Sequence, residues 1–116
     1  MDKEHSQLLQ ILKIGHDTSI RGEGISLRDA IKRTNYLENR KQFDSGDLVK
    51  IINENPELKH EWLMYSEDKR TSGGWYLREN GEIGQVSDPD SLIQSNTFTE
   101  AVAEFVIREL DYWSKI

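Results

Sequence analysis

The sequence predicts a single α+β domain over residues 1–116, made of N-terminal helices, a three-stranded antiparallel β-meander and a C-terminal amphipathic helix packed on the sheet. Two observations predict this class. Apolar residues follow a helical period at both ends of the chain, whereas short aromatic-rich runs joined by turn residues lie between them. Helices that flank an antiparallel sheet, without alternating with parallel strands, are typical of α+β proteins.

The N-terminal half is predicted to be helical. A first helix spans roughly residues 2–14, a second begins near Ser26 with its end left open by the pattern, and a third spans 44–55 and stops before Pro56. Each start carries a capping side chain, and each helix has apolar residues that face inward. Residues 15–26 contain three glycines without periodicity, which predicts a long loop.

Three short runs rich in large apolar residues predict the strands, at 61–66, 74–78 and 81–86. A polar loop joins the first two, and Asn80-Gly81 joins the last two because both residues tolerate a positive φ. Large side chains occupy both faces of the first two strands. The C-terminal helix covers one face. The other face either meets the N-terminal helices in a three-layered core or exposes Trp and Tyr side chains as interface anchors.

The C-terminal helix has the strongest pattern in the chain. Thr97 and Glu100 form a capping box at its start. Its apolar residues at helical spacing are Phe98, Val102, Phe105, Val106, Leu110 and Trp113. Its outer face is expected to carry the charged residues Glu104, Arg108, Glu109 and Asp111.

The formal net charge of −6 lies entirely in the C-terminal half. Residues 1–60 carry ten basic and ten acidic side chains, whereas 61–116 carry five basic and eleven acidic ones. Within 79–111, eight acidic residues accompany a single base, Arg108. Such one-sided charge repels nucleic acid and anionic membranes and attracts a basic protein. A face kept acidic only for solubility has the same composition.

The chain offers little for catalysis. It has no cysteine, its three histidines do not lie three or four residues apart, and it contains no P-loop, GxGxxG or GxSxG motif. The acidic run 87–91 lacks the spacing of a calcium loop and is interpreted as a turn. We therefore expect no enzyme activity, no metal and no cofactor. The alternative is a small enzyme with its site on loop 15–26, using His16 and Asp17.

Three helices followed by a β-hairpin are also the order of a winged-helix DNA-binding domain, with 44–55 as the recognition helix and 67–73 as the wing. That helix holds three acidic residues against Lys50, which suits phosphate contacts poorly. We expect no nucleic-acid binding and keep the winged helix as an alternative. No apolar run approaches the roughly 18 residues of a membrane span, and the N-terminus lacks a signal-peptide pattern. We therefore expect a cytoplasmic protein that binds no membrane.

Two segments, YSEDKRTSGGWYL (65–77) and TEAVAEFVIRELDYW (99–113), resemble in general character the small bacterial immunity proteins of polymorphic and contact-dependent toxin systems. The resemblance carries over no functional residue. It implies a small cytoplasmic protein that binds a cognate toxin domain, often a basic nuclease, and blocks it.

The sequence thus predicts a protein-binding module whose acidic surface engages a basic partner, with the oligomeric state left open. The predicted partner-binding residues come from the C-terminal half and combine acidic with aromatic side chains. They are Glu67, Asp68, Trp75, Tyr76, Glu79, Glu82, Asp88, Asp90 and Glu104.

Overall fold

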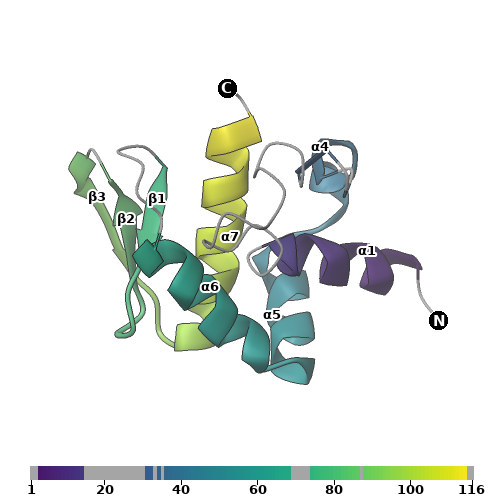
Figure 1. The fold of residues 1–116 in the computed structure, drawn as a ribbon, viewed down its shortest axis with the longest axis horizontal. Coiled ribbons are helices and arrows are strands. Elements are labelled where there is room, and N and C mark those ends of the chain that lie inside the picture. The colour runs from purple at the N-terminus through teal and green to yellow at the C-terminus, as the bar shows by residue number, and fades with distance from the viewer. Residues whose placement is uncertain are drawn as a thin grey trace.

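A three-stranded antiparallel sheet stands at one end of the molecule and helices pack against one side of it, which confirms the predicted α+β class (Figure 1). The computed structural model describes residues 3–14, 31, 32, 34, 36–68, 74–86 and 88–114. Its elements in chain order are α1 (Lys3–Leu12), α4 (Tyr36–Asn39), the 3-10 turn η1 (Arg40–Gln42), α5 (Ser45–Glu54), α6 (Glu57–Asp68), β1 (Trp75–Leu77), β2 (Glu82–Gln85), β3 (Asp88–Gln94) and α7 (Phe98–Ser114).

Helix α5 begins where its capping residues predict. The Asp44 side chain accepts a hydrogen bond from the Asp47 N–H (3.1 Å), and the Asp47 side chain accepts one from the Asp44 N–H (3.0 Å), so α5 starts with a complete capping box. Ile31 is buried, as expected for the second predicted helix. The rest of that helix and loop 15–26, with His16 and Asp17, lie outside the described residues.

The prediction of a first strand at 61–66 is wrong, because these residues belong to helix α6. Leu58, Trp62 and Tyr65 are buried at spacings of four and three residues, while Met64 is 40% exposed. That is a helical period. A six-residue apolar run is too short to separate helix from strand, and the period becomes visible only when the window extends back to Leu58.

The hairpin between β1 and β2 is confirmed. Gly81 has a φ of 86°, and its N–H donates to the Arg78 carbonyl (3.0 Å) to close the turn. The Arg78 N–H then donates to the Glu82 carbonyl (2.9 Å) and begins the ladder.

The third strand of the meander is β3. It was not predicted, because the acidic residues at 87–91 were interpreted as a turn. β3 pairs with β2 through Ile83 and Ile93, and the pairing shifts register after Ile83. At the shift, the Gln85 N–H donates to the Ser91 hydroxyl (2.6 Å). This irregularity shortens the regular alternation of the strand to a few residues, too few to mark it in the sequence.

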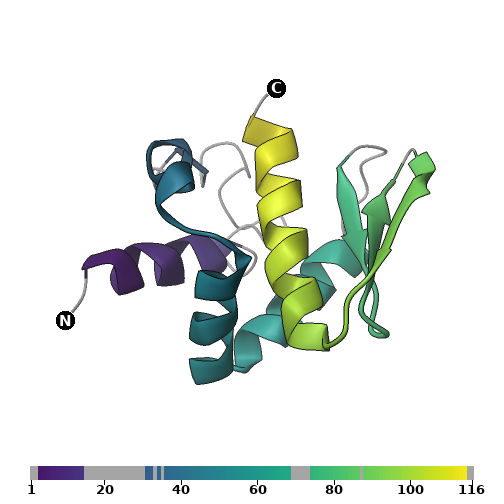
Figure 2. The ribbon, with the colours of Figure 1, turned by 180° about the vertical axis from the view of Figure 1, so that it is seen from behind.

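Helix α7 is the centre of the core and packs against α5, α6, β1 and β2 (Figure 2). The Thr97 hydroxyl accepts a hydrogen bond from the Glu100 N–H (3.1 Å) at its start, as the capping prediction requires. Phe105 meets Trp62 and Tyr65 of α6 edge to face, with ring centroids 6.0 and 6.2 Å apart. Trp62 also donates its indole N–H to the Leu12 carbonyl (2.7 Å), which ties α6 to the end of α1.

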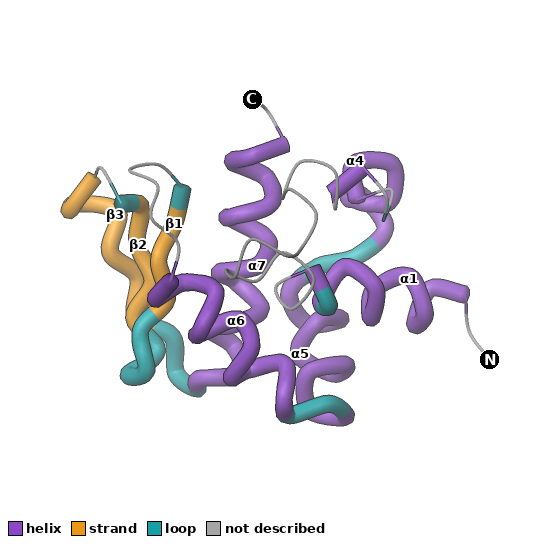
Figure 3. Tube along the Cα trace, in the orientation of Figure 1, coloured by secondary structure: helices purple, strands orange, loops and turns teal. Residues whose placement is uncertain are grey.

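The second face of the sheet meets neither α1 nor α5. Figure 3 shows the orange strands at one end of the molecule and these two helices at the other, with α6 and α7 between them. The N-terminal helices therefore pack on other helices, and among the described residues the three-layered alternative is not found. Tyr76 and Leu92 lie on the uncovered face, half-buried and exposed respectively.

Candidate protein-binding surface

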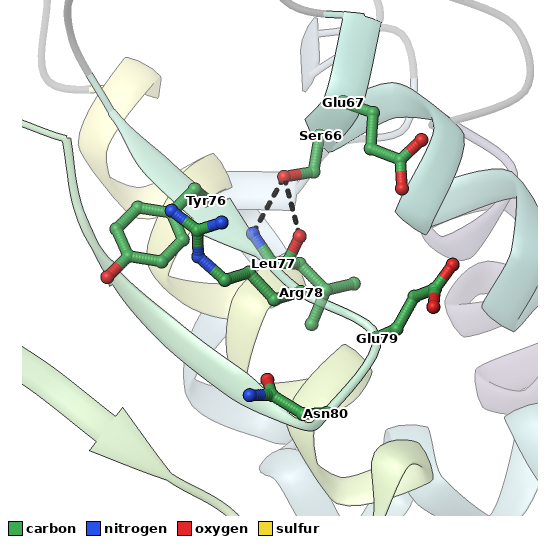
Figure 4. A pocket seen from close by; sticks show the side chains of 7 residues that line it. All are labelled: Ser66, Glu67, Tyr76, Leu77, Arg78, Glu79 and Asn80. Carbon is green, nitrogen blue, oxygen red and sulfur yellow. Dashed lines mark hydrogen bonds between the residues drawn. The ribbon is translucent and has the colours of Figure 1, made fainter.

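A groove lies between the C-terminal end of α6 and the β1–β2 turn (Figure 4). Its volume is about 510 Å³, and its lining residues are Ser66, Glu67, Tyr76, Leu77, Arg78, Glu79 and Asn80. Ser66 and Leu77 are buried and form its floor. The Ser66 hydroxyl accepts a hydrogen bond from the Leu77 N–H (2.7 Å) and donates one to the Leu77 carbonyl (3.1 Å), so the floor joins helix to strand.

Two acidic side chains form one wall of this groove. Glu67 at the end of α6 and Glu79 in the turn are both exposed, and Figure 4 shows their carboxylates extending toward the same space. Among the described residues, neither carboxylate makes a hydrogen bond or an ion pair. Both negative charges are therefore available to an external cation.

The opposite wall is formed by Tyr76 and Arg78, whose guanidinium lies 4.9 Å from the centre of the Tyr76 ring. Arg78 also pairs with Glu82, with Nε 3.1 Å from Oε2. Among the described residues, Arg78 is the only basic group in the lining, and it is already engaged by a carboxylate on its own hairpin. It does not neutralise Glu67 or Glu79 through a direct contact.

The Tyr76 ring keeps its place because residue 84 is glycine. A Cβ atom at Gly84 would lie 2.6 Å from the Tyr76 hydroxyl and 2.8 Å from Cζ, closer than such atoms approach in proteins. Tyr76 pairs with Gly84 across the hairpin, so the ring lies flat over the neighbouring strand. Of the two aromatic residues predicted as anchors, Tyr76 is the one presented on the outer face.

Trp75 lies on the inner face of β1, where the Arg108 guanidinium is 5.0 Å from its ring centre. Arg108 also donates to Glu104 (Nε–Oε2 3.3 Å). The predicted site residues Trp75 and Glu104 therefore share a neighbour on α7 and lie apart from the groove.

Glu109 was expected on the outer face of α7, and that expectation is wrong: the residue is fully buried, with 0% exposure. Its Oε2 accepts a hydrogen bond from the Tyr65 hydroxyl (2.8 Å), and its Oε1 accepts one from the Trp75 N–H (2.7 Å). Burial, followed by the charge of Glu109 and this hydrogen bond, raises the pKa of Tyr65 above its ordinary value of 10.0. The burial of Glu109 could have been predicted from the sequence, because position 109 lies four residues after Phe105 and therefore on the same face of the helix.

Asp111 is also turned toward the protein. Its Oδ1 accepts hydrogen bonds from the Tyr36 hydroxyl (2.7 Å) and from Arg40 Nε (3.0 Å). Burial first, and Asp111 second, raise the pKa of Tyr36 above 10.0. The acidic residues of α7 thus serve internal contacts to a larger extent than predicted.

The remaining predicted residues lie along the outside of the sheet. Asp88 and Asp90 are exposed at the start of β3, where the Asp88 carboxylate accepts a hydrogen bond from the Asp90 N–H (3.0 Å). Asp68 ends α6, and its side chain lies outside the described residues. Of the nine predicted residues, the groove gathers Glu67, Tyr76 and Glu79, with Glu82 beside them.

Other kinds of site find little support. In the described part of the chain, no three His, Asp or Glu side chains are grouped as metal ligands. No described helix combines the length and apolar character needed to cross a membrane. Residues 61–66, which the winged-helix alternative needs as the first strand of its hairpin, are helical.

No protein-family model matches the chain, and the comparisons with curated proteins and with solved structures found no match.

Proposed function

We propose that this protein is a non-catalytic binding module that inhibits a basic partner protein, in the role of an immunity protein toward a cognate toxin domain. The observation that carries the proposal is the pair of exposed carboxylates, Glu67 and Glu79, that extend into one groove without a basic partner among the described residues. Lys and Arg are the protein side chains that complement such a pair.

The surroundings of the groove support the same partner chemistry. Residues 74–94 contain four acidic side chains and one basic side chain, Arg78, which is paired with Glu82. A basic protein approaching the sheet therefore meets a negative potential before any contact forms, which raises its association rate. The half-buried ring of Tyr76 supplies an aromatic surface beside the carboxylates, of the kind found at energetically important positions of interfaces.

The first experiment is capture. The tagged protein is incubated with lysate of its native cells, supplemented with the product of the neighbouring gene. Stoichiometric recovery of a basic protein that is toxic when expressed alone, and harmless when co-expressed, is the expected result. Recovery of no basic protein by a correctly folded bait would contradict the proposal.

The second experiment locates the contact. A Glu67→Lys/Glu79→Lys variant should associate with the captured partner about tenfold more slowly at low salt, and its remaining affinity should depend less on salt. The matched control is Glu57→Lys/Glu100→Lys, which changes the net charge equally at exposed positions away from the groove. Equal losses in both variants would show that net charge acts without the groove.

A further inference from the structure

The edge of the sheet formed by β1 is closed by side chains. The hydrogen bonds Val86 N–H to Gly74 O (2.9 Å) and Arg78 N–H to Glu82 O (2.9 Å) set the ladder with β2. In an antiparallel ladder the intervening residues then direct their backbone groups away from β2. There the Trp75 N–H donates to Glu109, and the Leu77 N–H and carbonyl both bond to Ser66.

Among the described residues, the opposite edge, formed by β3, is covered only at its start, where the Asp90 N–H donates to the Asp88 carboxylate (3.0 Å) and the Asp88 carbonyl accepts from the Ser91 hydroxyl (2.7 Å). The Ser95 N–H donates to the Gly81 carbonyl (3.2 Å), so the next pair, Glu82 with Gln94, does not exchange ladder bonds. Leu92 and Gln94 accordingly direct their backbone N–H and carbonyl groups outward. Figures 1 and 2 show β3 as the outermost strand, with no described element beyond it.

The side chains beside this open edge have a defined chemistry. Exposed Asp90, Leu92 and Gln94 alternate with partly buried Ser91 and Ile93. Leu92 is 52% exposed, the highest value among the large apolar residues that the structure describes. A neighbouring strand would place its own side chains about 5 Å from these, where an apolar residue suits Leu92 and a basic residue suits Asp90.

We infer that the β3 edge accepts an extended segment of the basic partner as a fourth, antiparallel strand, with an apolar side chain beside Leu92 and basic side chains beside Asp90 and Asp88. The inference rests on the proposed function and assigns it a binding mode. Backbone pairing at a free sheet edge supplies affinity, and the alternating side chains supply specificity. A second copy of the chain fits this edge less well, because two β3 strands bring together four carboxylates and no basic group.

The first test uses the heptapeptide QTVTKTK, acetylated and amidated, and ¹⁵N-labelled protein. Antiparallel addition with the first residue opposite Gln94 places Val opposite Leu92 and directs the two Lys toward the acidic start of β3, at Asp90 and Asp88. We expect saturable shifts of the Leu92 and Gln94 amide resonances and slower exchange of these amides with solvent. Shifts centred on Glu67 and Glu79, with none at Leu92, would overturn the inference.

Two methylated peptides test the backbone pairing directly. N-methylation of the Val removes an N–H that must bond to β3, whereas N-methylation of the Thr that follows it alters an N–H that points away. The first should weaken binding at least about tenfold, the loss expected for one or two hydrogen bonds. The second should bind like the parent. Equal effects of the two methyl groups would overturn strand addition. A QTVTETE peptide should bind more weakly than the parent, and equal binding would overturn the assigned charge of the occupant.

Variants of the protein give the complementary test. Leu92→Pro removes only an outward N–H, so the fold should persist, whereas peptide binding should be lost. Leu92→Thr keeps that N–H and should retain binding. If Leu92→Pro fails to fold by circular dichroism, Leu92→Lys provides the test, because its charge opposes the basic strand and should weaken peptide binding.

The outcomes separate this inference from the proposed function. Loss of peptide pairing, together with partner capture that still depends on Glu67 and Glu79, would overturn strand addition and leave the proposed function standing. A mass twice that of the monomer, reverting in Leu92→Pro, would instead assign the edge to a second copy and overturn the partner assignment.

Discussion

At the β1 edge, two helices supply side chains that bond three outward backbone groups of the strand, whereas the β3 edge meets no other described element. Ser66 and Glu109 lie 11 and 34 residues from the backbone groups they bond. Free edges expose unpaired backbone groups that recruit other strands, so proteins usually protect them. One edge is therefore part of the core, whereas the other leaves the Leu92 and Gln94 backbone groups uncovered by any described element. Substitutions at both edges, and alkaline pH, test this contrast.

Glu109 is the strongest support of the closed edge. Glu109→Leu removes the acceptor of one buried and one partly buried hydrogen bond and should lower the free energy of unfolding by about 3–5 kcal/mol. Glu109→Gln keeps one acceptor oxygen and should lose clearly less. Urea unfolding followed by tryptophan fluorescence measures both. A Glu109→Leu variant as stable as the parent protein would show that the edge is held by other contacts.

Ser66 closes the other half of the same edge. Ser66→Ala removes both bonds to Leu77 and should destabilise the protein by about 1–3 kcal/mol, since a buried N–H and carbonyl lose their partner. Hydrogen exchange should accelerate at the Leu77 amide. Met64→Ala, an exposed change in the same helix, is the control and should leave that amide unaffected. Acceleration in both variants would indicate general loosening of α6.

Alkaline pH should weaken the closed edge through Tyr65. Its folded-state pKa lies above the ordinary 10.0, so the folded protein holds this proton more tightly than the unfolded chain. The resulting stability is complete below pH 10 and falls as the pH rises above 10, with a slope of about 1.4 kcal/mol per pH unit for one group. Tyr65→Phe should flatten the measured decline by that amount. An unchanged slope would mean that Tyr65 ionises in the folded state as readily as in the unfolded chain.

The open edge should tolerate substitution. Leu92→Thr changes an exposed side chain that contributes no ladder bond, and we expect a change in unfolding free energy within about 0.5 kcal/mol. Ile93→Thr, one residue along on the packed face, should destabilise by about 1–2 kcal/mol through lost apolar burial. Thermal unfolding of the two variants under the same conditions measures both changes in stability. A larger loss at Leu92 than at Ile93 would reverse the assignment of the two faces.

Local patterns predicted the elements whose determinants are close together in sequence. The capping residues Asp44 and Thr97 and the Asn80-Gly81 turn each act within four residues, and each is found as predicted. Helix α6 was mistaken for a strand because the six residues 61–66, taken alone, fit both a helical and a strand period.

The groove and the two sheet edges depend on contacts between distant residues, which no local pattern contains. The serine of α6 bonds Leu77, and the glutamate of α7 bonds Trp75, only after the helices have packed on the sheet. The acidic character of the surface was visible in composition. Composition did not distinguish carboxylates that bond inside the fold, such as Glu109, from exposed ones, such as Glu67.

The groove combines residues of the core with exposed side chains. Its floor, where Ser66 bonds Leu77, belongs to the core, whereas the carboxylates on its wall, Glu67 and Glu79, belong to exposed side chains. Substitutions at exposed positions usually change stability by less than about 0.5 kcal/mol. Under the proposed function, single substitutions on this wall would change the choice of partner while leaving the stability of the fold nearly unchanged.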